Sequence, residues 1–140
     1  MFRMLVAAAL AVAASVTTAA QEPKKETAKL TVDIFASHDD EKLAKEVPEN
    51  GVIVSQKGWE KLAKAWGIKE PAKVDFDKEI LVVGTTVGSR LNLNPKLDDK
   101  GDLKVLGLAT ADLRPGFRYA IKSVSKTGVK TVNGKALPKE

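Results

Sequence analysis

SQKGWEKLAKAWGIKEPAKVDFDKEILVVG, residues 55–84, contains both tryptophans of the chain and its most apolar strand-like segment. Apolar side chains in its first half recur at the spacing i, i+3, i+4 and i+7, which is one face of an α-helix. Ser55 is a suitable N-cap, and Gly67 is the kind of residue that ends a helix in the left-handed conformation. The stretch therefore predicts an amphipathic helix that packs on a sheet through Trp59, Leu62, Ala63 and Trp66.

The two tryptophans have an alternative interpretation, as an exposed platform on which a sugar ring or a base stacks. Their regular spacing with Leu62 and Ala63 is what core packing requires. We therefore expect Trp59 and Trp66 in the core, where each ring buries roughly 150–250 Å².

The second half of the stretch predicts a central strand. Residues 80–83 form a continuous apolar run, which is typical of a strand covered on both faces. Further short strands are expected where apolar residues alternate or cluster between turns. These segments are residues 30–36, 52–54, 90–94, 103–108, 117–124, 129–132 and 135–137.

Turn and capping signals connect these segments. Ser37, with Asp40 three positions later, predicts a capping box that opens a short helix before Pro48. Pro95 is expected to end the strand at 90–94, and Asn133-Gly134 predicts a tight hairpin. Helices early and strands late predict an α+β domain with a mainly antiparallel sheet, sandwich-like or barrel-like. One main Trp-bearing helix and a shorter second helix would pack on it.

The first 20 residues have the pattern of a signal peptide. Arg3 precedes an apolar run at residues 5–16, and small residues at Thr18 and Ala20 predict cleavage after Ala20. A membrane anchor is disfavoured, because a span needs about 20 apolar residues. Residues 21–29 predict a flexible lead-in, and residues 30–140 a single domain. We expect an exported protein, periplasmic or extracellular, with no membrane span in the mature chain.

Composition disfavours several kinds of function. The net charge is +5, the lysines are scattered, and aromatic residues make up 5% of the chain, so no nucleic-acid partner is expected. The chain has no cysteine, which excludes a thiol nucleophile and a thiolate metal site. Residues 84–89 superficially resemble a phosphate-binding loop, but the Lys and the following helix are missing, so we expect a bend.

Catalytic and metal-binding candidates are few. The single histidine, His38, is followed by acids that suit a helix N-terminus, so we expect a structural or merely exposed role. Asp98, Asp99 and Asp102 approach a calcium loop, but their spacing misses that pattern. We predict a protein that is not an enzyme and that holds no metal and no cofactor.

The three arginines that follow the leader are the binding candidates. Arg90, Arg114 and Arg118 all lie beside turns that contain glycine. Arginine makes two-pronged contacts with carboxylates and other anions that lysine does not make. Together with Ser89, these residues are our candidate binding site, provided that the fold brings them together.

One set of motifs resembles a known family. The helix Trp59-x-x-Leu62-x-x-x-Trp66 is followed by Pro71 and by VDFDKEI at residues 74–80, which leads into an apolar strand. This arrangement resembles the PrcB-like (protease complex subunit) family of small exported bacterial domains, over about residues 51–125. The resemblance implies an accessory or stabilising role beside another protein. The family commonly carries Gly-Gly-Tyr after the central strand, whereas this chain has Gly88-Ser89-Arg90-Leu91 there.

Three functions are compatible with these observations. The first is an exported, non-enzymatic β-rich module that binds a protein, such as a protease, or a cell-envelope component. The second is a small protease inhibitor that presents loops 84–90 and 111–117. The third and most remote is a hydrolase that uses His38 or the acidic turns. The sequence leaves the oligomeric state open.

Overall fold

The computed structural model describes residues 31–139, so the predicted leader at 1–20, the lead-in at 21–29 and Leu30 lie outside the described residues. This range forms two helices and eight strands in two four-stranded sheets. The elements are β1 Asp33–His38, the 3-10 helix η1 Glu41–Glu46, β2 Val52–Ile53, α1 Gln56–Ala65, β3 Glu79–Thr86, β4 Leu91–Leu97, β5 Asp102–Ala109, β6 Phe117–Ser125, β7 Thr131–Val132 and β8 Lys135–Ala136.

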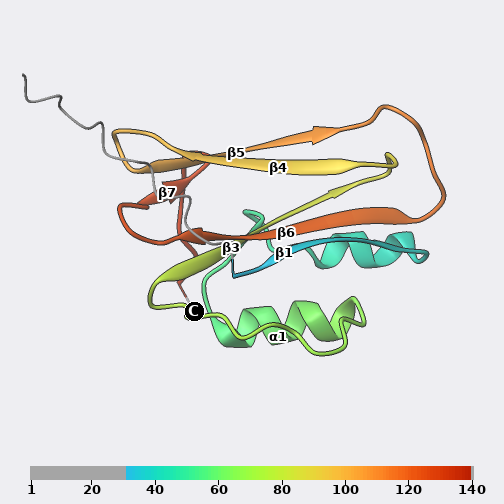
Figure 1. The fold of residues 1–140 in the computed structure, drawn as a ribbon, viewed down its shortest axis with the longest axis horizontal. Coiled ribbons are helices and arrows are strands. Elements are labelled where there is room, and N and C mark those ends of the chain that lie inside the picture. Colours follow the sequence, from blue (N-terminus) through green and yellow to red (C-terminus); the bar gives the residue numbers. More distant parts are fainter. Residues whose placement is uncertain (1–30, 140) are drawn as a thin grey trace, which may run out of the picture.

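The elements form three layers (Figure 1). The central sheet has the strand order β1-β6-β3-β2 and is antiparallel throughout. The outer sheet has the order β4-β5-β7-β8, with one parallel pair, β5–β7. Helix α1 packs on one face of the central sheet, and the β4–β5 hairpin lies over the other. The predicted α+β fold is confirmed, and in this part of the chain the sheets form an open sandwich, not a closed barrel.

Strand β3 is buried on both faces, as its sequence predicts. Leu81 and Val83 pack in the cluster that contains the α1 side chains, whereas Ile80 and Val82 pack against the outer sheet. All four are 6% exposed or less. The alternation of side chains along a strand explains the division, because successive residues point to opposite faces.

Both tryptophans are core residues. Trp59 is 0% and Trp66 is 3% exposed. Their indole N–H groups donate to backbone carbonyls, that of Trp59 to Ala72 at 2.9 Å and that of Trp66 to Leu43 at 2.8 Å. The Trp66 ring lies 4.5 Å from the Tyr119 ring, centroid to centroid. An exposed stacking platform is excluded, because the rings are covered and their polar atoms are satisfied.

Helix capping follows the sequence for α1 but not for η1. Ser55 Oγ accepts from the Gly58 amide at 3.1 Å, and Gly67 has a φ of +64°, as expected. The short helix is of the 3-10 type, and its N-cap is Asp40, whose carboxylate accepts from the Lys42 amide at 3.0 Å. The prediction of Ser37 as the cap is wrong, because β1 continues through His38.

The prediction that Pro95 ends its strand is also wrong. Arg90 and Asp98 flank β4, and each makes a backbone hydrogen bond across to the returning chain: the Arg90 carbonyl accepts from the Thr110 amide, and the Asp98 amide donates to the Asp102 carbonyl. Along an antiparallel strand, successive residues direct their backbone groups alternately toward the partner strand and away from it. The backbone N–H groups of the odd-numbered residues of β4 therefore point away from β5. Proline lacks that N–H and fits on such an outer edge.

The predicted Asn133-Gly134 hairpin is present between β7 and β8. Asn133 and Gly134 have φ angles of 49° and 78°, which suit this tight hairpin.

Between residues 31 and 139, no helix combines the length and the apolar character that a membrane crossing requires.

Replacing Trp66 with alanine tests the packing of α1. We expect Trp66→Ala to lower the free energy of unfolding by about 3–5 kcal/mol, because it leaves a cavity and an unpaired Leu43 carbonyl. Lys61→Ala on the exposed face of α1 is the control and should change it by less than about 0.5 kcal/mol. Urea unfolding followed by circular dichroism measures both, and equal effects would contradict the assigned core.

Candidate functional site

The two loops that the sequence singled out, residues 84–90 and 111–117, lie next to each other. Residues 84–90 contain the end of β3 and its connection to β4, and residues 111–117 contain the connection from β5 to β6 and the first residue of β6. The Arg114 amide donates to the Val87 carbonyl at 3.0 Å, and the Thr110 amide donates to the Arg90 carbonyl at 3.2 Å. These bonds tie the two loops, hereafter the loop pair, into one unit.

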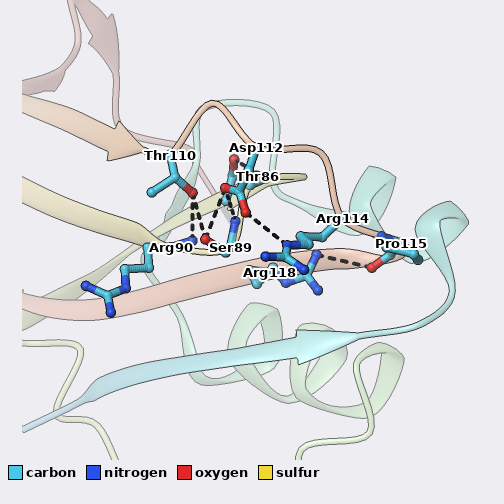
Figure 2. Close-up of polar contacts among 9 residues, drawn as sticks. Thr86, Ser89, Arg90, Thr110, Asp112, Arg114, Pro115 and Arg118 are labelled. Atoms are coloured by element: carbon cyan, nitrogen blue, oxygen red, sulfur yellow. Dashed lines mark hydrogen bonds and ion pairs between the residues drawn. The ribbon is translucent and has the colours of Figure 1, made fainter.

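The carboxylate of Asp112 is the centre of the loop pair (Figure 2). Its Oδ1 accepts from the Ser89 amide at 2.9 Å and from Ser89 Oγ at 3.0 Å. Its Oδ2 accepts from Arg114 Nε at 3.0 Å. The hydrogen bond from the Ser89 amide is the largest reason that the pKa of Asp112 lies well below the usual range of aspartate, with the Thr110 and Arg114 side chains adding to it.

The close approach of the two loops depends on glycine at position 88. A Cβ there would collide with the Thr110 carbonyl oxygen, which is backbone and cannot move aside cheaply. The Gly88 amide donates to Thr86 Oγ1 at 3.0 Å. The bend that we predicted at residues 84–89 falls at residues 87–89, after β3 ends at Thr86.

The candidate binding residues separate into two groups. Arg114 is engaged with Asp112, and Arg118 Nη1 donates to the Pro115 carbonyl at 3.1 Å. Figure 2 shows these two guanidinium groups at the same end of the loop pair. The Arg90 side chain points the other way, and Ser89 lies between, with its hydroxyl turned to Asp112.

Arg90 instead borders an open hollow of about 500 Å³ that is lined by residues of both sheets. Two of its walls are exposed apolar side chains, Phe35 from β1 at 51% and Leu108 from β5 at 56%. The remaining lining residues are Leu91, Asn92, Ala109 and Thr110. The sequence did not predict this site, although one signal was present, namely Phe35 among the otherwise polar residues of one strand face.

The side chains considered for catalysis have structural contacts. His38 Nδ1 accepts from the Asp40 amide at 3.0 Å, and its ring stacks on Phe117 at 5.8 Å. Asp98 accepts from the backbone amides of its own turn, those of Lys100 and Asp102, each at 2.9 Å. In the range 31–139, no group of three or more His, Cys, Asp or Glu side chains is placed to hold a metal ion.

No family model, no curated protein and no solved structure matches the chain. The resemblance to PrcB-like domains therefore depends on the quoted motifs alone and stays a prediction.

The network around Asp112 predicts a pH-dependent loop pair. A lowered pKa in the folded state stabilises the fold above the unfolded value, about 3.9, and this contribution is lost as the pH falls through the folded value. In an NMR titration, the Ser89 amide shift should stay constant down to about pH 4 and change only below it. Asp112→Asn removes the titrating group, so a Ser89 shift that still follows the same curve in this variant would contradict the assignment.

Proposed function

We propose that this chain is an exported, non-enzymatic module that binds another protein of the cell envelope. The observation that carries the proposal is the open hollow, which places exposed Phe35 and Leu108 beside one cation, Arg90. Large exposed apolar side chains that lie together are typical of protein-binding surfaces. An aromatic residue and an arginine are also the types that most often contribute strongly to binding.

Most of the other exposed apolar residues belong to the elements that line or adjoin the hollow. Six large apolar side chains of the described residues are exposed, and five of them belong to β1, β5 or the loop pair. Those five are Phe35, Val87, Leu106, Leu108 and Leu113. The sixth, Leu97, lies at the far end of β4 and serves as a control position.

The hydrogen bonding of polar side chains supports a binding role over a catalytic one. Ser89 donates to Asp112, whose lowered pKa makes it a weak base, and Arg114 is paired with the same carboxylate. A hydroxyl nucleophile needs an effective base beside it. These contacts favour a rigid surface, and the family resemblance points in the same direction.

A capture experiment with matched variants tests this proposal. Immobilised mature chain is exposed to envelope extract, and Leu108→Glu is compared with Leu97→Glu, since both replace an exposed leucine with the same charge. We expect wild type and Leu97→Glu to retain a partner that Leu108→Glu loses. That partner, once purified, should bind wild type at least tenfold more tightly than Leu108→Glu in calorimetry. Identical protein sets on all three surfaces would refute the proposal.

A protease inhibitor is the second candidate, and one observation favours it. Leu113 is 83% exposed, yet its neighbours are held, Asp112 through the Ser89 amide and Arg114 through the Val87 carbonyl. A side chain presented on a pinned loop loses little conformational entropy when it enters a cleft.

Inhibition assays against serine, cysteine, aspartic and metallo-proteases test this candidate. If it holds, wild type inhibits at least one class, and Leu113→Asp weakens the inhibition at least tenfold while Leu97→Asp does not. Thermal melts should be alike, because both leucines are exposed. No inhibition by micromolar wild type in any class would eliminate this candidate.

A further inference from the structure

Within residues 31–139, the outer edge of β1 has no strand partner. In the central sheet β1 pairs only with β6, and no strand within residues 31–139 covers its other side. The Ser123 amide donates to the Val32 carbonyl at 2.9 Å, which fixes the alternation of the ladder. The backbone N–H and C=O groups of the even-numbered residues of β1 therefore point toward β6, and those of Asp33, Phe35 and Ser37 point outward.

This edge lacks the features that usually prevent strand addition. Proteins protect open edges with lysine, proline or a bulge. The outer edge of β4 fits that description, because it carries Pro95 and Lys96. The sequence of β1, DIFASH, has neither residue, and its pairing with β6 is continuous over all six positions. Of these two edges, β1 is the one open to an added strand.

The side chains next to this edge define what an added strand should carry. Residues that pair across two strands have their side chains on the same face of the sheet. On one face of the central sheet, Asp33 is paired with Lys122, Phe35 with Ala120, and Ser37 with Arg118. Phe35 and Arg90 also line the hollow. Three cations thus lie along this apolar site, Arg118 and Lys122 on the strand beside β1 and Arg90 at the hollow, and they outnumber the single carboxylate of β1, Asp33.

We propose that β1 and the hollow bind an extended, acidic segment of the protein partner by adding it as a fifth strand to the central sheet. This inference rests on the proposed binding function and specifies its partner. Alternate residues of a strand lie on the same face of the sheet. If the added strand has an apolar residue beside Phe35, its residue two positions further in the direction of Ser37 lies next to Ser37. A carboxylate there lies toward Arg118, and Arg90 at the hollow adds to the positive charge along the site. The recognised pattern is an acidic residue two positions from an apolar one. A second copy of this chain is disfavoured, because it would bring like-charged surfaces together.

A fluorescent peptide, Thr-Val-Glu-Val-Leu-Val-Thr, is the probe, and fluorescence anisotropy measures its dissociation constant. Ser37→Pro removes an outward N–H and leaves the β6 ladder intact, while Ser37→Ala is the matched control. We expect Ser37→Pro to weaken binding roughly tenfold or more and Ser37→Ala to have little effect. A peptide N-methylated at alternate residues should also fail to bind.

A charge exchange tests the acidic preference separately. With Lys in place of Glu, the peptide should bind wild type at least about threefold more weakly. The same Lys peptide should bind Arg90→Glu more tightly than it binds wild type. Equal affinities for both peptides would overturn the charge assignment.

The outcomes separate this inference from the proposed function. If the Leu108-sensitive partner is captured equally well by Ser37→Pro, strand addition is wrong although the binding function stands. If neither the partner nor the peptide binds, both fail. A dimer in sedimentation equilibrium that Ser37→Pro dissociates would assign the edge to a second copy and overturn the proposal.

Discussion

The pairing of β3 with β6 is the interaction on which the rest of this structure depends. Eight consecutive residues of β3 pair with β6, and both strands are covered on their two faces. Helix α1 and its tryptophans pack on one side of this pair, and the β4–β5 hairpin packs on the other. The loop pair exists because β3 and β6 each connect to that hairpin at the same end of the molecule. A change that separates the two strands would therefore remove the core and the candidate site together.

The elements with strong local patterns were predictable from the sequence. The helix with Trp59 and Trp66, the strand at 80–83 and the Asn133-Gly134 hairpin each have a periodicity or a turn signal of their own. The failures occurred where tertiary pairing overrides a local signal. Ser37 has the right spacing for a cap, but it is drawn into β1 by its pairing with Arg118. Pro95 is tolerated because nothing in the described range needs its missing N–H.

The candidate site was less predictable than the fold, because its parts come together across the chain. Ser89 and Asp112 are 23 positions apart, and no motif links them. The sequence did single out loops 84–90 and 111–117, yet it gave no reason to expect a carboxylate between them. Arg90 directly follows Ser89 in the sequence, but its side chain borders the hollow that Phe35 and Leu108 line. The direction in which an arginine side chain points depends on strand twist and on the path of the loop. Residue types alone do not specify either.

The long separation between β1 and its partner has a consequence for the order of folding during synthesis. The Thr31 amide bonds to Ser123 Oγ across 92 positions, and β1 has no other strand partner within residues 31–139. Contacts so distant in sequence form slowly, because a long loop must close first. The ribosome must release residue 125 before the central sheet is complete. Until then β1 and β3 both lack β6, so the apolar strand β3 keeps one unpaired edge in the nascent chain, which is then most exposed to aggregation.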